Sequence, residues 1–356
     1  MSITDRVKDV LRVRPARKAI NREIVRMAEQ VAAAAPTPGD SKTIISFNAS
    51  TRITGLSLNA AFSMLIGWSL HLQGARVVNF VCQRGMSRCV LGTHADDMLR
   101  TPPCKQCLAQ SHAVYDHAEV EGFGSFDDAG INGQLHHLSL DELMAFEFEG
   151  VPLGALCLPS MRWILRRHHL LDDQPTRLLY WHYITSAYGV AQRFERLLGR
   201  TDPTALMVFN GMQFPEATAR WVAQKHGVPA YSHEVGLRPF SAFFTDGEAT
   251  AYPVDIPNDF QLSPAQDRRL DDYLSKRFKG DFSMAGVQFW PEMSGLDGDF
   301  LRKLDEFEQV VPVFTNVIFD TSQPHANVVF PDMFVWLDDV LETAKAHPET
   351  LFVIRA

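Results

Sequence analysis

Three side chains that can do chemistry follow a short apolar segment at residues 228–232: His233, Glu234 and Arg238. An imidazole or a carboxylate can take a proton from a hydroxyl group. The planar guanidinium group of an arginine binds a carboxylate or a phosphate through paired hydrogen bonds. These residue types therefore indicate acid–base chemistry on a polar or anionic molecule. The alternative for His233 and Glu234 is a solvated pair of loop residues.

The elements that would position these side chains form one parallel β-α-β unit. The apolar run 206–209 is typical of a buried strand, and a turn follows it at Asn210 and Gly211. A helix is predicted at about residues 215–226, because it opens with a proline and Gly227 follows it. Ligands of open α/β sheets bind at the carboxyl ends of the strands. The unit thus predicts a fold and a location for a site.

Cysteines form the second group of residues whose side chains can do chemistry. Four of the five cysteines lie between residues 82 and 107. They are Cys82, Cys89, Cys104 and Cys107. In a reducing compartment such clustering favours a metal over disulfides. Four thiolates would hold a structural zinc ion, an iron–sulfur cluster uses the same ligands, and a set of buried thiols is the alternative. His94 and His112 are reserve ligands, whereas Cys157 is predicted to lie in the core.

Length and charge limit the class of protein. A chain of 356 residues exceeds the usual size of a single core, so two domains are expected. The 34 Lys and Arg residues against 42 Asp and Glu residues give a net charge of −8, which argues against nucleic acid as a partner. The start of the chain has no secretory signal pattern, and the longest apolar run, 60–72, is too short to cross a bilayer. We expect a cytoplasmic protein.

The pattern predicts an α/β fold with a preceding helical segment. Residues 1–39 are basic and helical, and their part 3–35 could contact the inner membrane peripherally, although packing on the body of the protein is the commoner arrangement. Residues 40–290 form a first α/β domain, which carries the cysteine-rich insertion 82–107. Strands at 43–48 and 76–81 flank its first helix.

A second α/β domain is predicted for residues 300–356. Its strand at 310–314, helix at 332–346 and strand at 351–355 form another parallel unit. A buried strand needs a following loop and helix to cover it, and the chain ends one residue after this strand. We therefore expect a C-terminally truncated fragment whose second domain is incomplete.

Two pairs of segments resemble the capsule polysaccharide biosynthesis family. The first pair is Val-Phe-Asn-Gly-Met-Gln-Phe-Pro-Glu at 208–216 and Gly-Val-Pro-Ala-Tyr-Ser-His-Glu-Val-Gly-Leu-Arg at 227–238, and the second pair lies at 313–320 and 330–337. Members of this family are bacterial glycosyltransferases or their close relatives. The resemblance implies a GT-B-like arrangement of two Rossmann-like domains, with the acceptor on the first and the nucleotide-sugar on the second. In such proteins His-Pro-x-Glu follows the strand that here ends at Arg355.

The resemblance also implies a reaction and roles for residues. A sugar would pass from a nucleotide-sugar donor to a polysaccharide or lipid-linked saccharide acceptor, with no metal at the transfer centre. A carboxylate or histidine would deprotonate the acceptor, and helix N-termini and basic groups would stabilise the departing phosphate. The implied base is Glu234 or His233, with Asp320 as the alternative. The implied substrate contacts are Asn210, Gly211, Arg238, Thr315, Asn316 and His325.

Two other functions fit the same residues. A nucleotide-sugar epimerase can share the two-domain plan, and a non-catalytic sugar-binding or assembly protein of capsule polysaccharide export would need the polar groups only for binding. A nucleic-acid-binding zinc module is disfavoured by the acidic balance and by the lack of a basic stripe beside Cys104.

Overall fold

The structure is a computed structural model of the whole chain. It describes residues 14–355 except 38–41, 50–52, 54, 99, 127, 237, 239, 253, 282, 285–286 and 289–294. The chain divides into two compact units. Unit 1 comprises Met1–Glu234 and Ala242–Ala249, and unit 2 comprises Val235–Ser241 and Thr250–Ala356. The segment 250–290, which sequence patterns assigned to the first domain, thus belongs to unit 2.

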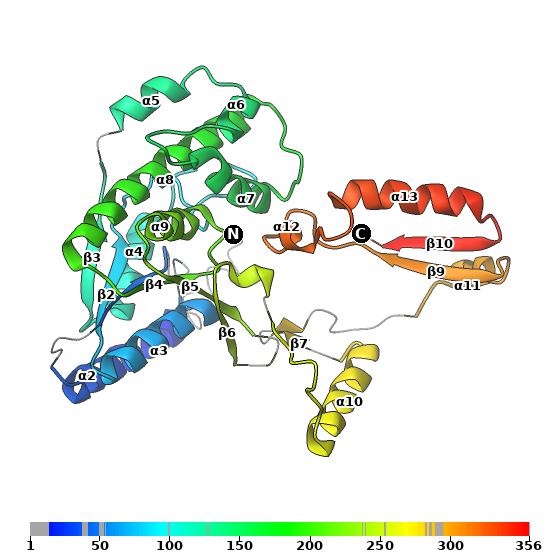
Figure 1. Cartoon of the computed structure of the whole chain (residues 1–356), viewed down its shortest axis with the longest axis horizontal. Helices are drawn as coiled ribbons and strands as arrows, with labels where there is room; N and C mark the ends of the chain where they lie inside the picture. The colour runs from blue at the N-terminus through cyan, green and yellow to red at the C-terminus, as the bar shows by residue number, and fades with distance from the viewer. Residues whose placement is uncertain are drawn as a thin grey trace. The chain divides into compact units, whose positions relative to one another are not determined.

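A six-stranded sheet organises unit 1 (Figure 1). Its strands are β1 (Thr43–Phe47), β2 (Arg76–Cys82), β3 (Glu119–Phe123), β4 (Ala205–Phe209), β5 (Ala230–Val235) and β6 (Ala242–Asp246). Their order across the sheet is β3-β2-β1-β4-β5-β6, and β1 pairs in parallel with both β2 and β4. The pairs β2–β3 and β4–β5 are parallel as well. This is the strand order of a doubly wound, Rossmann-like sheet, and it confirms the predicted α/β class.

Helices cover both faces of this sheet. They are α2 (Arg14–Ala34), α3 (Leu58–Leu72), α4 (Cys104–Val114), α5 (Ala129–Leu135), α6 (Leu140–Met144), α7 (Leu153–Leu165), α8 (Gln174–Thr201) and α9 (Phe214–Lys225). In Figure 1, α2 and α3 lie on one face, and α8 and α9 lie on the other. The central strands are therefore buried on both sides, which explains why they are short apolar runs.

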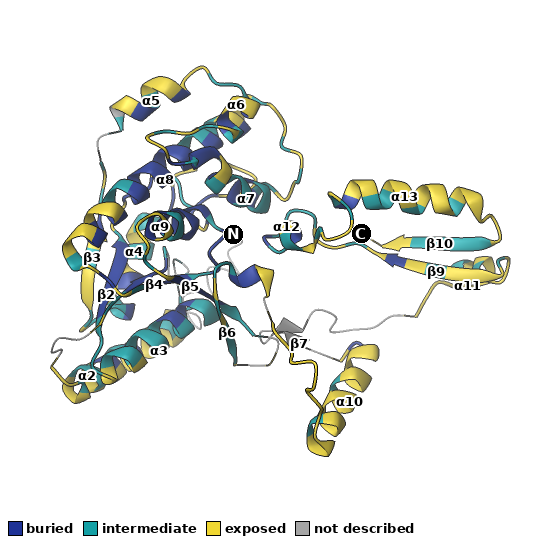
Figure 2. Cartoon of the chain, in the orientation of Figure 1, coloured by how far each residue is buried: buried dark blue, intermediate teal, exposed yellow. Residues whose placement is uncertain are grey.

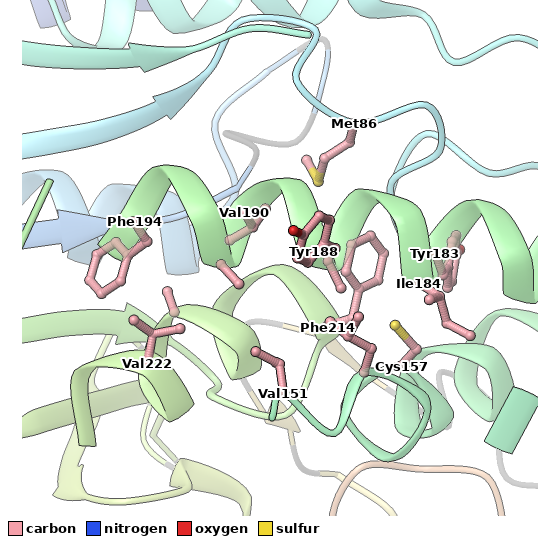
Figure 3. Close-up of a cluster of buried hydrophobic side chains, with 14 of the residues drawn as sticks. Met86, Val151, Cys157, Tyr183, Ile184, Tyr188, Val190, Phe194, Phe214 and Val222 are labelled. Atoms are coloured by element: carbon pink, nitrogen blue, oxygen red, sulfur yellow. The ribbon is translucent and has the colours of Figure 1, made fainter. Parts of the chain in front are cut away.

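The core of unit 1 centres on α8, which packs against α7 and α9 (Figure 3). The ring of Tyr183 lies 4.6 Å from the ring of Phe214, between centroids, and its hydroxyl donates to Thr93 at 2.9 Å. A buried tyrosine thus keeps a hydrogen-bond partner. Cys157 lies in the same cluster and is fully buried, as predicted.

Two segments differ from the sequence prediction. Residues 116–133 are polar and glycine-rich, a pattern that predicts a long loop or short helices. Within them, residues 119–123 instead form the edge strand β3, whose acidic residues Glu119 and Glu121 pair with Arg76 and Arg200. A charged edge strand lacks the apolar run by which strands are recognised. The sequence pattern also predicts a strand at 251–254. The described residues there form no strand, and a short 3₁₀ turn, Ala249–Ala251, occupies the start of this segment.

The basic N-terminal segment packs on unit 1 over its described part. The described part of helix α2 spans Arg14–Ala34 and contacts α3 and α4. Asn21 exchanges two amide hydrogen bonds with Gln110 of α4, at 3.2 and 3.0 Å. The part at 3–13 lies outside the described residues. Within the described ranges, no helix is long and apolar enough to cross a membrane.

Unit 2 contains the second parallel unit. Its elements are α10 (Pro264–Phe278), β7 (Ser283–Met284), β8 (Val287–Gln288), α11 (Gly298–Leu304), β9 (Gln309–Phe314), α12 (Gln323–Ala326), α13 (Met333–Ala346) and β10 (Thr350–Arg355). β9 and β10 pair in parallel, and α13 connects them, as the sequence predicted. Ser263 caps α10 in a capping box with Gln266. Figure 2 shows α10 and α13 far more exposed than α8.

Candidate functional site at the carboxyl edge of the sheet

The strand order reverses between β1 and β4, and this point defines the candidate site. After β1 the chain runs outward to β2 and β3, and it then returns to β4 on the other side of β1. Because β1, β4 and β5 are parallel, their carboxyl ends share one edge. Asn48 follows β1 and Asn210 follows β4, and both are buried, while Glu234 lies near the end of β5. Ligands of such sheets bind in the crevice at this position.

Two asparagine amides hold the Glu234 carboxylate. Asn59 Nδ2 donates to Oε1 at 2.8 Å, and Asn210 Nδ2 donates to Oε2 at 3.0 Å. Glu234 is half-buried. Each carboxylate oxygen has two lone pairs, so an oxygen that accepts an amide hydrogen can also accept a hydroxyl. The arrangement therefore fixes the direction of the carboxylate and leaves it the capacity to act on a substrate hydroxyl.

The turn after β4 has a strained backbone that supports this geometry. Asn210 and Gly211 both have left-handed backbone angles, with φ values of 60° and 84°. The Asn210 side-chain oxygen accepts from the N–H of Met212 at 3.1 Å, which leaves its amide nitrogen directed at Glu234. A Cβ atom at Gly211 would lie 2.5 Å from Ser232 Oγ. The turn predicted from Asn210 and Gly211 thus needs these residue types.

His233 lies in the interior rather than at an accessible surface. Its side chain is fully buried between the rings of Phe209 and Phe244, and Nε2 is hydrogen-bonded to Ser63 Oγ at 2.6 Å. Burial lowers the pKa of His233 to about 4, so the ring is neutral near pH 7. Of the two candidate bases on β5, Glu234 is half-buried and His233 is fully buried.

Sequence reasoning missed a second carboxyl group at this edge. Glu216, in the first turn of α9, is buried, and its Oε1 accepts from the N–H of Ala49 at 2.8 Å. It thereby connects the loop after β1 to α9. Burial raises the pKa of Glu216 to about 7. From the sequence alone it resembles any acidic residue in a first helical turn, where the helix dipole favours one.

Several buried polar atoms at this edge lack a hydrogen-bond partner within the described part of the chain. They are Asn59 Oδ1, Ser232 Oγ and His233 Nδ1. Buried polar atoms are hydrogen-bonded in the great majority of cases. Asn59 is the one of these residues that bonds to Glu234. Ser232 and His233 are fully buried, so ordered water can supply their missing bonds.

The candidate residues of unit 2 make hydrogen bonds within that unit. Thr315 donates to the carbonyl of Arg355 from both its N–H and its hydroxyl, each at 3.0 Å. Asn316 Oδ1 accepts from the N–H of Val317 at 2.8 Å. Asp320 Oδ2 accepts from the hydroxyl of Ser322 at 2.6 Å. These contacts order the loop after β9, as side chains that cap a turn do.

The two remaining candidates also lie in unit 2. His325 is in the short helix α12, and Arg238 is exposed and lies in the part of unit 2 that spans Val235–Ser241. Asn316 lines a hollow of about 350 Å³ together with Phe330 and Trp336. Asn316, a predicted contact residue, thus lies beside a hollow in unit 2. Glu234 and Asn210 lie at the carboxyl edge of the sheet in unit 1.

The four clustered cysteines line one small cavity in unit 1. Burial raises the pKa of Cys82 to about 11 and that of Cys89 to about 12. His94 and His112 are exposed and do not line the cavity. As the side chains stand, no three Cys, His, Asp or Glu residues among those described form a group that could hold a metal ion.

Comparison with known proteins leaves the family open. No family model and no curated protein matches the chain. Among solved structures, the chain matches the structure of a CDPS from Fluoribacter dumoffii with a TM-score of 0.31 and 9% identity, over 58% of this chain and 91% of that one. A similarity at this level carries no functional argument.

Proposed function

We propose that the chain is a glycosyltransferase that moves a sugar from a nucleotide-sugar to a saccharide acceptor, with Glu234 as the base. The observation that carries the proposal is the Glu234 carboxylate, held by Asn59 and Asn210 where the strand order reverses. The likeness of the segments at 208–216 and 227–238 to capsule polysaccharide proteins supports the same reading.

The proposed sugar transfer depends on an oriented carboxylate and uses no metal at the transfer centre. An acceptor hydroxyl hydrogen-bonded to Glu234 loses its proton as it attacks the anomeric carbon of the donor, and the sugar–phosphate bond breaks. The two asparagines keep the carboxylate directed at that hydroxyl, which is the positioning that such a reaction requires. In this proposal unit 1 binds the acceptor.

Unit 2 supplies the donor side in the proposed GT-B plan. Its parallel β9–α13–β10 unit would belong to the second nucleotide-binding fold in that plan. Thr315, Asn316, His325 and Arg238 are the proposed donor contacts. Asp320 is the alternative base of this proposal, and its Oδ2 accepts hydrogen bonds from the N–H and the hydroxyl of Ser322.

The test replaces the carboxylate while keeping its shape. Glu234→Gln retains a hydrogen-bonding side chain but cannot take a proton, so we expect kcat for nucleotide release to fall by about 100-fold or more. Assays would use a panel of nucleotide-sugars with oligosaccharide acceptors. Glu119→Gln is the matched control. That carboxylate is exposed and lies at the first residue of the edge strand β3, away from the carboxyl ends of the strands.

Other outcomes separate the alternatives. An unchanged kcat in Glu234→Gln would show that Glu234 is not the base. Conversion of the donor sugar without an acceptor would identify an epimerase. Saccharide binding by the wild-type protein, measured by calorimetry and weakened by Glu234→Gln, with no turnover of any donor, would identify a non-catalytic sugar-binding protein of polysaccharide assembly.

A further inference from the structure

Three segments of unit 1 bring four thiols to one cavity. Cys82 is the last residue of β2, Cys89 lies in a turn that follows, and Cys104 and Cys107 occupy the first turns of α4. All four line a cavity of about 30 Å³. Cys82 and Cys89 each lie close enough to the other two thiols to interact with them electrostatically. The fold therefore brings together four thiols that are spread over 26 sequence positions, residues 82–107.

Backbone N–H groups are directed at two of these sulfur atoms. The N–H groups of Arg84 and Gly85 donate to Cys82, and the N–H of Gly92 donates to Cys89. Arg84 adopts a left-handed φ of 61° in this turn. Such N–H donors stabilise a sulfur that carries negative charge, as a metal-bound thiolate does. The N-terminal end of α4 favours negative charge on its two cysteines for the same electrostatic reason.

The turn after Cys89 packs closely against the residues that precede α4. A Cβ atom at Gly92 would lie 2.7 Å from Cys89 Sγ and 2.8 Å from the Cβ of Pro102. Glycine at this position thus lets the turn pack against the start of α4. Between β2 and α4, the described residues of 83–103 form turns and bends with one isolated bridge, His94 to Asp97. A segment with so little regular structure gains most from a cross-link.

The lining of this cavity suits a metal site, because it supplies four thiols. An iron–sulfur cluster uses the same four ligands, and metal analysis distinguishes such a cluster from a single ion. Four thiolates around one ion give the tetrahedral site of structural zinc, with Zn–S distances of about 2.3 Å. The thiols as they stand do not form a metal-binding group, so the ion must draw them inward by side-chain rotation.

We propose that Cys82, Cys89, Cys104 and Cys107 bind one structural Zn²⁺ ion. The proposal is independent of the glycosyltransferase assignment. The ion ties the turn after β2 to the start of α4. Ala49 lines the same cavity, and its N–H donates to Glu216 at the candidate site. The metal thereby also supports the loop that follows β1.

The experiment measures metal in the purified protein under reducing conditions. We expect about one zinc per chain by elemental analysis. Cys104→Ser should lose most of its zinc on dialysis, because three thiolates and a hydroxyl bind zinc more weakly. Cys157→Ala is the control and should keep its zinc, since that thiol lies in the hydrophobic core away from the cavity.

A second measurement serves if the serine variant does not fold. Wild-type protein exchanged with Co²⁺ should show the strong charge-transfer and visible absorption of tetrahedral thiolate coordination. Iron with acid-labile sulfide in place of zinc would overturn the single-ion site. Protein that contains neither metal, gives no cobalt thiolate spectrum and has four thiols that react freely in the native state would overturn the site altogether.

Discussion

At the scale of single residues, two buried titratable side chains affect stability in opposite directions as the pH changes. Burial raises the pKa of Glu216 from 4.5 to about 7, so the folded state loses stability as the pH rises between these values. Burial lowers the pKa of His233 from 6.5 to about 4, so the folded state loses stability as the pH falls between these values. Between pH 4.5 and 6.5 the two contributions oppose each other.

Removing either group should expose the contribution of the other. In Glu216→Gln, we expect the free energy of unfolding to rise with pH between 4.5 and 6.5, by up to about 1.4 kcal/mol per pH unit. In His233→Gln it should fall with pH over the same range, and the wild-type profile should lie between the two. Urea unfolding across this range is the measurement, with Glu119→Gln as the control. Parallel profiles for the two variants would contradict the linkage.

The element that matters most for the site is α3. It places Asn59 against Glu234 and, one turn later, Ser63 against His233. Ser57 starts this helix, because its side chain accepts from the N–H of Ala60 at 3.1 Å. An N-cap of this kind satisfies a backbone donor that the helix itself cannot pair. The cap therefore contributes to the geometry around Glu234 without touching it.

Loss of this cap should loosen the start of α3. We expect Ser57→Ala to reduce the stability of unit 1 by about 1 kcal/mol and to speed amide hydrogen exchange in the peptides that cover the first turns of α3. Ser263→Ala is the matched control, because it removes the equivalent cap of α10 in unit 2. Exchange in α3 that responds equally to both substitutions, or to neither, would refute this role for Ser57.

At the scale of the whole molecule, the two units differ in how well their sheets are covered. Ile45 of β1 and Leu206 of β4 are fully buried in the centre of a six-stranded sheet. In unit 2, the two-stranded sheet leaves Phe314 67% exposed and Ile354 42% exposed. A two-stranded sheet packed on one helix has few buried contacts, and such regions open at lower free energy.

Hydrogen exchange should therefore divide the chain into two stability classes. We expect amides of β1 and β4 to exchange more slowly than those of β9 and β10, by about tenfold or more, which corresponds to about 1.4 kcal/mol in opening free energy. Mass spectrometry of peptic fragments from the intact chain measures both sets at once. Protection of β10 equal to that of β4 would show that unit 2 is as stable as unit 1.

The sequence by itself determined the local elements. The strand–helix–strand units around 43–82, 205–235 and 309–355 were predicted from the spacing of apolar residues and from proline and glycine at helix ends, because these signals act between near neighbours in the chain. The polar residues at the end of β5 were recognisable for the same reason. The edge strand β3 was missed because its charged residues hide the apolar pattern.

Only the tertiary structure decided which side chains meet. Asn59 lies 175 positions from the Glu234 it holds, and Ala49 lies 167 positions from Glu216. No local pattern encodes such contacts, since they depend on the order in which the strands pair and on the face that each helix covers. The burial that makes His233 neutral and that raises the pKa of Glu216 arises from the same long-range packing.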